Sequence, residues 1–320
     1  MKVLVCGASG LIGGNMVRYL KERGHKVIGV DIKPPSYGIN EMADEFVQAD
    51  LRRKDIWEHL HHKDPYQWIF QFAADMGGAG FVFTGDNDAD IMHNSAMINL
   101  HAAKTFCKDQ GTKLFYSSSA CAYPFESIGR PGVTQFKETD AYPAMPESDY
   151  GWEKLFSERM YLAHKRNFGL DVRMARFHNI FGPYGTWQGG REKYPAAICR
   201  KVAETPNGGT IELWGDGTAL RSYLYIDECL EGIEKLMMLD KVVENPINIG
   251  SDYSISVKDM AEMVMGIAGK KLEIKYIPGP VGVAARNSDN TLVKKVLGWS
   301  PTKPLVDGMT KLYRWIESQI

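Results

Sequence analysis

A tyrosine and a lysine spaced four residues apart carry the first chemical signal in this sequence. Tyr150 and Lys154 lie in the run Tyr150-Gly151-Trp152-Glu153-Lys154, and this spacing places both on one face of a helix. A phenol with a pKa of about 10 is a poor base, but a neighbouring ammonium and a bound nicotinamide cation would favour its ionised form. Such a phenolate could remove an alcohol proton as a hydride leaves the same carbon. Alone, a Tyr-x-x-x-Lys pair is usually a surface pair, so its weight depends on its surroundings.

A glycine-rich turn near the N-terminus indicates the hydride acceptor. Gly7-Ala8-Ser9-Gly10-Leu11-Ile12-Gly13 follows an apolar run and opens a helical pattern. Its glycines would allow a tight turn, approach to a pyrophosphate and close helix packing, with helix amides facing the anion. Asp31 ends the next apolar run, where its carboxylate would bind an adenosine ribose and repel a 2′-phosphate. We therefore predict NAD over NADP, although Lys33 weakens that preference and Asp31 could be an ordinary turn residue before Pro34-Pro35.

The apolar pattern predicts the elements that position these residues. Short apolar runs, typical of parallel strands buried on both faces, lie at residues 2–6, 27–30, 46–47, 68–72 and 113–116. Helix-length stretches separate them, and the first helix is expected to end at Gly24. Ser117-Ser118-Ser119 lies at the end of the last of these strands, upstream of Tyr150. We predict an α/β fold with a Rossmann-like, doubly wound parallel sheet.

The residue composition changes after about Gly182, where glycine and proline become frequent. Loop-rich segments beyond the carboxyl edge of a sheet usually hold substrate pockets. We therefore assign residues 1–180, with a return segment at about 222–258, to a dinucleotide-binding domain. Residues 181–221 and 259–320 are assigned to a smaller, mixed substrate-binding part.

Composition excludes several classes of partner. The 320 residues carry a net charge of −1 from 38 basic and 39 acidic side chains, which disfavours nucleic acid and anionic membranes. No apolar stretch approaches the roughly 20 residues of a membrane span, and we read no signal peptide. Five scattered cysteines without a Cys-x-x-Cys pair indicate neither a disulfide framework nor zinc, and favour the cytoplasm. Three histidines at positions 59, 61 and 62 lack companions at ligand spacing, so we expect no metal site.

Longer motifs make the sequence similar to a known family. They are Ala73-Ala74-Asp75-Met76-Gly77-Gly78, Ser118-Ser119-Ala120-Cys121-Ala122-Tyr123-Pro124, Arg176 to Trp187, Gly189-Gly190-Arg191-Glu192-Lys193, Trp214-Gly215-Asp216-Gly217 and Arg286-Asn287-Ser288-Asp289-Asn290. Together with the dinucleotide turn they resemble the extended short-chain dehydrogenase/reductases that act on nucleotide sugars, and within them the GDP-mannose 3,5-epimerases. The likeness covers nearly the whole chain. Ala79, Ala122 and Trp152 depart from the expected residues without removing a chemical group.

The resemblance implies an activity and a catalytic set. GDP-mannose would be converted to GDP-L-galactose, with GDP-L-gulose as a further possible product, by transient oxidation at C4 and inversion at C3 and C5. Tyr150 would be the C4 base, Lys154 would hold the phenolate and the cofactor ribose, and Ser119 would bind the C4 oxygen. Cys121 would be the base and Lys193 the acid of the inversions. By sequence alone, Cys121 reads as an inert core thiol and Lys193 as part of a solvated charge run.

The resemblance also implies the contact residues. Cofactor contacts are expected from Gly7, Gly10, Leu11, Ile12, Gly13, Asp31, Asp50, Ala73, Tyr150 and Lys154. Substrate contacts are expected from Gly78, Ser119, Ala120, Cys121, Asn179, Glu192, Lys193, Lys201, Arg221 and Arg286. Among these, Arg221 and Arg286 are candidates for bidentate binding of a diphosphate, with Lys201 as a point charge. A homodimer through two long helices is implied as well.

Two other functions fit parts of the sequence. An epimerase-reductase of the GDP-fucose synthase type also pairs a serine-rich strand end with a cysteine and a Tyr/Lys dyad, but it needs NADPH, against which Asp31 argues. A dinucleotide-binding regulator could keep the fold without the chemistry, although the complete catalytic set disfavours it.

Overall fold

The first 31 residues form one strand–helix–strand unit whose ends follow from its sequence. In the computed structural model, residues 1–38, 42–62, 65–124, 135–241, 243–280, 282 and 284–320 are described. Strand β1 (Lys2–Cys6) is buried from its second residue onward, helix α1 (Leu11–Glu22) follows, and strand β2 (Lys26–Asp31) runs parallel to β1. Gly24, with φ +74°, supplies the left-handed residue that ends α1, as predicted.

Seven parallel strands form the central sheet in the order β12-β7-β5-β4-β1-β2-β3. The strands after β2 are β3 (Glu45–Gln48), β4 (Trp68–Gln71), β5 (Lys113–Ser119), β7 (Asp171–Phe177) and β12 (Ile247–Ile249). The chain crosses from β3 to β4 on the other side of β1, so the crevice at which ligands bind in such sheets opens above β1 and β4. The predicted doubly wound parallel sheet is confirmed.

The strand predicted at residues 113–116 continues through all three serines to Ser119. Polar residues tolerate this buried position because each finds a partner: Ser117 Oγ donates to the Gln71 carbonyl at 3.2 Å, and Ser118 Oγ donates to Glu158. The extension carries Ser119 to the carboxyl edge of the sheet, level with Phe177 of β7.

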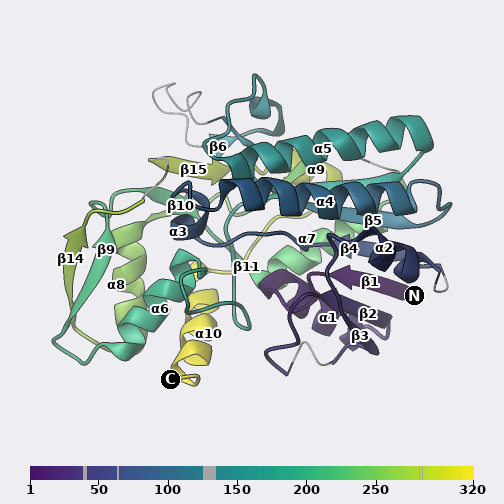
Figure 1. Ribbon diagram of the computed structural model, residues 1–320. Helices are drawn as coiled ribbons and strands as arrows, with labels where there is room; N and C mark the ends of the chain where they lie inside the picture. The colour runs from purple at the N-terminus through teal and green to yellow at the C-terminus, as the bar shows by residue number, and fades with distance from the viewer. Residues whose placement is uncertain (39–41, 63–64, 125–134, 242, 281, 283) are drawn as a thin grey trace.

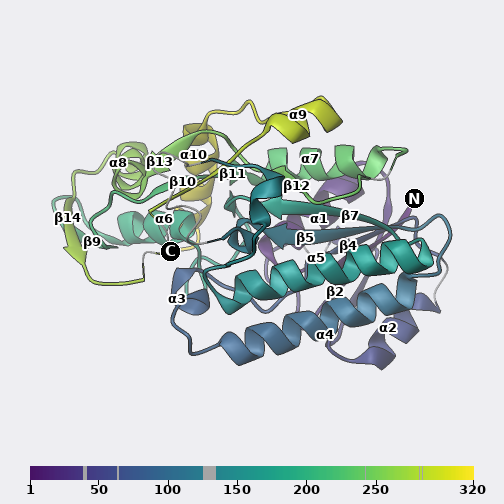
Figure 2. The ribbon, with the colours of Figure 1, turned by 90° about the horizontal axis from the view of Figure 1, so that it is seen from above.

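Helices cover both faces of the sheet, as Figures 1 and 2 show. One face packs against α2 (Lys54–His61), α4 (Asp88–Phe106) and α5 (Asp149–Phe168), whose apolar residues form one buried cluster. The other face packs against α1 and α7 (Ile226–Met238), and α9 (Thr291–Leu297) lies beside α7. The two layers bury most of the sheet, as a parallel sheet requires, and the edge strand β3 stays partly exposed.

The remaining elements lie beyond one end of the central sheet, away from the N-terminus (Figure 1). They include helices α3 (Ala79–Val82), α6 (Tyr194–Glu204), α8 (Val257–Ala268) and α10 (Leu305–Glu317), and the 3-10 turns η2 (Ala120–Ala122) and η4 (Glu138–Ala141). A four-stranded sheet has the order β13-β10-β15-β6, from β6 (Gln135–Phe136), β10 (Leu220–Ser222), β13 (Ser254–Ser256) and β15 (Ala285–Ser288). Two parallel pairs join β8 (Ile180–Phe181) to β11 (Leu224–Tyr225), and β9 (Thr210–Trp214) to β14 (Glu273–Ile277).

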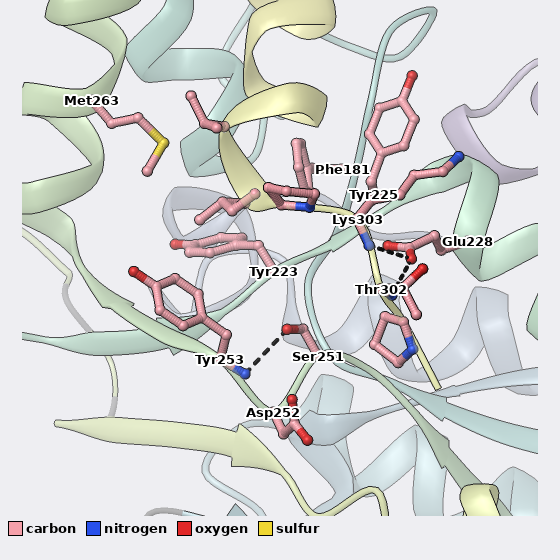
Figure 3. A pocket seen from close by; sticks show the side chains of 14 residues that line it. Phe181, Tyr223, Tyr225, Glu228, Ser251, Asp252, Tyr253, Met263, Thr302 and Lys303 are labelled. Atoms are coloured by element: carbon pink, nitrogen blue, oxygen red, sulfur yellow. Dashed lines mark hydrogen bonds between the residues drawn. The ribbon is translucent and has the colours of Figure 1, made fainter. Parts of the chain in front are cut away.

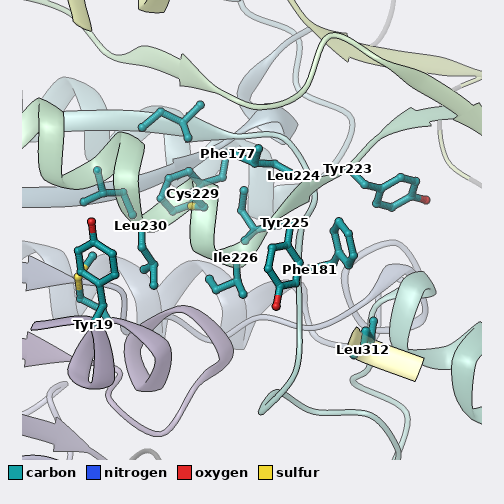
Figure 4. Packing of buried hydrophobic residues seen from close by; sticks show 14 of the residues in the cluster. Tyr19, Phe177, Phe181, Tyr223, Leu224, Tyr225, Ile226, Cys229, Leu230 and Leu312 are labelled. Carbon is teal, nitrogen blue, oxygen red and sulfur yellow. The ribbon is translucent and has the colours of Figure 1, made fainter. Parts of the chain in front are cut away.

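One apolar cluster joins this outer region to the sheet. Ile226 and Leu230 of α7 and Phe177 of β7 belong to the same buried cluster as Leu312 of α10 (Figure 4). The outer elements therefore share the core of the sheet and hold a fixed position over its carboxyl edge. Among the described residues, no helix is long and apolar enough to cross a membrane.

Candidate active site

The glycine turn between β1 and α1 is built by close backbone contacts. The amides of Gly7 and Ala8 both donate to the Val30 carbonyl, at 2.8 and 3.1 Å. Gly7 has φ +81°, and a Cβ there would lie 2.8 Å from the Ala73 nitrogen; one on Gly13 would lie 2.0 Å from the Gly7 oxygen. Gly10 is the N-cap residue of α1 and has no side chain that could cap the helix. The positive end of the α1 helix dipole therefore faces the glycine turn.

Asp31 is fixed to the glycine turn by its own carboxylate. Its two oxygens accept hydrogen bonds from the amides of Ser9 and Lys33, both at 3.0 Å. The Lys33 bond belongs to an ordinary turn, but the Ser9 bond ties the carboxylate to the dinucleotide turn across 22 residues. The glycine cradle and this carboxylate fit the pyrophosphate and ribose of a dinucleotide.

Two of the other predicted cofactor residues lie close to this turn. Ala73 follows β4 and abuts Gly7, and Leu11 lies under Gly185, where an added Cβ would approach the Leu11 Cβ to 2.9 Å. Asp50 forms an ion pair with Arg52 at 2.6 Å, and this hydrogen-bonded arginine lowers the pKa of the Asp50 carboxyl. Arg52 also donates to Asn94 on α4 at 3.2 Å.

The tyrosine and lysine of the dyad are both buried beside the serine strand end. Ser148 caps α5 by accepting from the Gly151 amide, and Tyr150 and Lys154 are 8% and 3% exposed. Lys154 Nζ donates to the Ser117 carbonyl at 3.1 Å and lies 5.5 Å from the centre of the Tyr150 ring. A surface pair is therefore ruled out.

Burial dominates the electrostatics of this dyad. Desolvation and the charge of Cys121 raise the pKa of Tyr150, and a hydrogen bond with Ser119 opposes them. Desolvation also lowers the pKa of Lys154. Burial thus opposes ionisation of Tyr150, and the expected help from Lys154 and from a bound nicotinamide cation stays a prediction.

Cys121 lies against the first turn of α5. Ser119 is the N-cap of η2, and its Oγ accepts from the Cys121 amide at 3.1 Å. A Cβ on Gly151 would lie 2.2 Å from the Cys121 carbonyl oxygen, so only glycine lets α5 begin this close to η2. Cys121 is half-buried, next to the buried Ala120, whereas Cys6, Cys107, Cys199 and Cys229 are buried in the interior.

Arg286 reaches the thiol of Cys121. Its Nη1 donates to Sγ at 3.2 Å, and its Nη2 forms an ion pair with Glu147 at 3.0 Å. The parallel pairing of β10 with β15 sets Arg221 directly beside Arg286, and burial together with this second guanidinium lowers the pKa of Arg221. Sequence reasoning missed Glu147 and the Arg286 contact, because nothing local to either residue signals a partner more than a hundred residues away.

Lys193 lies close enough to Cys121 for their charges to interact. It is the N-cap residue of α6, and burial lowers the pKa of its ammonium while the charge of Cys121 opposes that shift. The Gly78 amide donates to the Arg191 carbonyl at 3.0 Å, and a Cβ on Gly78 would lie 2.2 Å from the Glu192 oxygen. Gly78 therefore permits the segment that carries Lys193 to lie tightly over the site.

Three predicted substrate residues already have protein partners. Asn179, with φ +46°, donates from Nδ2 to the Ser222 carbonyl at 2.9 Å. Glu192 pairs with Arg200 at 3.2 Å, and Lys201 Nζ donates to the Glu212 carbonyl at 2.6 Å. To contact the substrate as predicted, these side chains would use their remaining polar atoms or give up their protein partners.

His178 is fully buried. Its Nε2 donates to Asn248 Oδ1 at 3.1 Å, an oxygen that also accepts from the Tyr123 hydroxyl. Burial lowers the pKa of His178 to about 3, so the ring is neutral at physiological pH.

A cavity of about 400 Å³ lies elsewhere (Figure 3). Its lining includes Phe181, Tyr223, Tyr225 and Tyr253, with Glu228 and Lys303 at one side. None of its lining residues belongs to the predicted catalytic set. The described residues also hold no group of three or more histidine, cysteine or carboxylate side chains that could bind a metal.

Comparison with known proteins gives a consistent picture. Residues 3–250 match the NAD dependent epimerase/dehydratase family. Along its whole length the chain is 43% identical to GDP-mannose 3,5-epimerase of Arabidopsis thaliana and 42% identical to GDP-mannose 3,5-epimerase 1 of Oryza sativa subsp. indica, covering 83% and 82% of those proteins. The fold matches that of Bacillus cereus UDP-glucuronic acid 4-epimerase, solved with UDP-glucuronic acid and NAD, with a TM-score of 0.85, 23% identity and full coverage of both chains.

Proposed function

This chain belongs to the NAD dependent epimerase/dehydratase family, and we propose that within it the chain acts as a GDP-mannose 3,5-epimerase. The proposed reaction converts GDP-mannose to GDP-L-galactose, with GDP-L-gulose as the product of inversion at C5 alone. The observation that carries the proposal is the convergence of Cys121, Lys193 and Arg286 beside the buried Tyr150. Full-length identity of 43% to a protein with this activity supports it.

In the proposed chemistry, one oxidation at C4 makes both inversions possible. The C–H bonds at C3 and C5 of a hexose are not acidic, but a ketone at C4 acidifies both through enolate stabilisation. NAD, when bound, supplies the hydride acceptor at C4 and later the donor, so the net reaction consumes no cofactor.

Tyr150, Lys154 and Ser119 are proposed to act at C4. Tyr150 removes the hydroxyl proton and later returns it, and Ser119 binds the same oxygen. Lys154 holds the phenolate and the cofactor ribose through the ammonium that now donates to the Ser117 carbonyl. The two buried side chains exclude water from the carbon that loses its hydride.

Cys121 and Lys193 are proposed as the base and the acid of the inversions. An inversion needs a base on one face of the carbon and an acid on the other, and these side chains reach the site from η2 and from the N-terminus of α6. Burial lowers the pKa of Lys193, which makes its ammonium a readier proton donor. The Arg286 guanidinium donates to the Cys121 sulfur, the contact that a thiolate base would accept.

The predicted contact residues and domains follow from the same assignment. Arg221 and Arg286 would bind the diphosphate, with support from Gly78, Ala120, Asn179, Glu192 and Lys201 around the sugar and nucleotide. The dinucleotide would bind to the domain formed by residues 1–180 and about 222–258. The substrate would contact the part formed by residues 181–221 and 259–320. Strand β12, in the return segment, joins the central sheet, in keeping with that division.

We further propose a homodimer in the cytoplasm. Helices α4 and α5 pack side by side and expose Leu100, Trp152 and Phe156 at 37%, 40% and 47% on their outer surface. A second pair of such helices would cover this apolar face. Five free thiols without a disulfide are compatible with a reducing compartment.

The test incubates the purified protein with GDP-mannose in deuterated water without added cofactor, followed by product identification by NMR. We expect epimers that carry deuterium at C3 or C5. Turnover of only a 4-keto sugar, and only with NADPH, would instead identify an epimerase-reductase. Binding of NAD without turnover of either sugar would identify a regulator.

A further inference from the structure

Two buried side chains of opposite charge are neighbours on α5 and form no ion pair. Glu153 is fully buried and Lys154 nearly so. Glu158, one turn further along, pairs with Arg176 at 2.7 Å, but within the described residues neither Glu153 nor Lys154 has such a partner. Because a buried charge is costly unless it is compensated, Glu153 needs a role beyond packing.

Hydrogen bonds hold one carboxyl oxygen of Glu153 in place. Asn99 Nδ2 and Ser157 Oγ both donate to its Oε1, at 3.0 and 2.6 Å. The Asn99 amide is oriented by Gln71 and Tyr161, which donate to its Oδ1 at 3.0 and 3.2 Å. Oε2 is buried and has no hydrogen-bond partner in the described part of the chain. Within the described residues, the hydrogen bonds to this carboxyl group are thus all made to Oε1.

We propose that Glu153 is a positioning residue that acts through Lys154, as the counter-charge that keeps this buried lysine an ammonium during turnover. The inference deepens the proposed function and rests on it for its role in catalysis. The electrostatics agree: burial lowers the pKa of Lys154, and the charge of Glu153 is the largest that opposes this shift. Glu158, which is paired with Arg176, contributes less.

Other ionisable groups also face Lys154 and must be kept unchanged in a test. They are Tyr150 and Glu158 on α5, Tyr116 on β5, Cys121 on η2 and Lys193 at the start of α6. The charge of Glu153 also raises the pKa of Tyr150. Loss of the charge should therefore lower the pKa of the base and of its ammonium partner together.

The decisive variant is Glu153→Gln, because glutamine has the shape of a neutral carboxylic acid. The full-length proteins are labelled with [13Cε]lysine and titrated by NMR, with the Lys154 signal assigned by its loss in Lys154→Arg. We expect the Lys154 midpoint to fall by about one pH unit or more. The pH profile of epimerisation should move toward acid on both limbs, whereas a purely structural defect would lower activity without moving it. An unmoved Lys154 midpoint would overturn the proposal.

Two comparisons separate charge from packing. Glu153→Asp keeps the carboxylate, so its Lys154 midpoint should lie close to that of the wild type. Ser157→Ala removes one hydrogen bond but no charge, so it should shift the Lys154 midpoint much less than Glu153→Gln does. If Glu153→Gln does not fold, the wild-type protein still decides, since the 13Cδ signal of Glu153, assigned with Glu153→Asp, must be that of an ionised carboxylate at pH 7. A protonated signal would overturn the proposal. These titrations need no substrate, so an inactive wild-type protein would refute the proposed function without deciding this question.

Discussion

The thiol of Cys121 shares the Arg286 guanidinium with the carboxylate of Glu147. This arrangement gives the thiol a charged hydrogen-bond donor that no other cysteine of the chain has among the described residues. It also changes the expectation for Arg286, which was predicted to bind a diphosphate and is found beside the proposed base. Both roles remain compatible, because a guanidinium presents five N–H donors and only two are used here.

Replacement of the proposed base should separate oxidation from inversion. In Cys121→Ala we expect deuterium exchange at C3 and C5 to fall by at least about 100-fold, because a general base contributes on that order. Transient oxidation at C4 should persist, since Tyr150 and Lys154 are untouched, and it can be followed as absorbance of reduced nicotinamide.

Cys107→Ala is the matched control. Cys107 is buried at the end of α4, where its sulfur contacts the Lys104 carbonyl, and its loss should leave exchange unchanged. Retained exchange in Cys121→Ala would show that another group is the base.

At the scale of elements, the geometry of the site depends on the close approach of the first turn of α5 to η2. Gly151 places the first turn of α5 against the Cys121 carbonyl and fixes Tyr150 relative to Ser119 and Cys121. The glycine is needed for space rather than for its dihedral angles, because it lies inside the helix without positive φ.

Gly151→Ala should move the start of α5. The added Cβ would lie 2.2 Å from a backbone oxygen, so the helix must shift, at a cost of about 1–3 kcal/mol in the free energy of unfolding. Because the shift displaces Tyr150, kcat should fall more than ten-fold, measured by the epimerisation assay together with urea unfolding.

Gly266→Ala provides the control for the same substitution. Gly266 lies in α8 with open space around it, so alanine should stabilise the protein by about 0.5–1 kcal/mol and leave kcat unchanged. Wild-type kcat in Gly151→Ala would mean that the position of the α5 terminus does not govern the chemistry.

The sequence predicted the elements of the sheet better than their contacts. The strands at residues 2–6, 27–30 and 68–72 carry their own apolar signal, and the structure has them within one or two residues. The serines were predicted at the end of a strand, but the partners from β4 and α5 that satisfy them inside the buried β5 were not. The pairing of β6 with β15 was not predicted either, because it joins two short segments that lie about 150 residues apart in the sequence.

On the scale of the whole molecule, the outer surface of α4 and α5 is the most distinctive feature outside the site. Trp152 is exposed there although it lies two residues from the buried Tyr150, so the same helix serves the site with one face and offers an apolar surface with the other. Assembly through this surface would place each site near a subunit contact.

Charges on this surface should separate the proposed dimer. We expect the double variant Leu100→Glu with Phe156→Glu to have a mass near 35.9 kDa by light scattering and the wild type to have twice that value, because burying unpaired carboxylates opposes association. Met238→Glu, a change at a residue 64% exposed at the end of α7 on the other face of the sheet, should remain dimeric. A wild-type protein with the mass of one chain would contradict the proposed assembly.

The unequal burial of the five thiols has a practical consequence. Cys6, Cys199 and Cys229 are completely covered, and burial raises the pKa of each, so they are poor targets for alkylating reagents. Cys107 is almost as well covered, which leaves Cys121 as the least buried of the five cysteines. A single equivalent of a thiol-reactive probe would therefore mark this position in the folded protein, and the labelled fraction in a mass spectrum would count competent sites in any preparation. Protection of that label by a nucleotide sugar would report binding without any turnover.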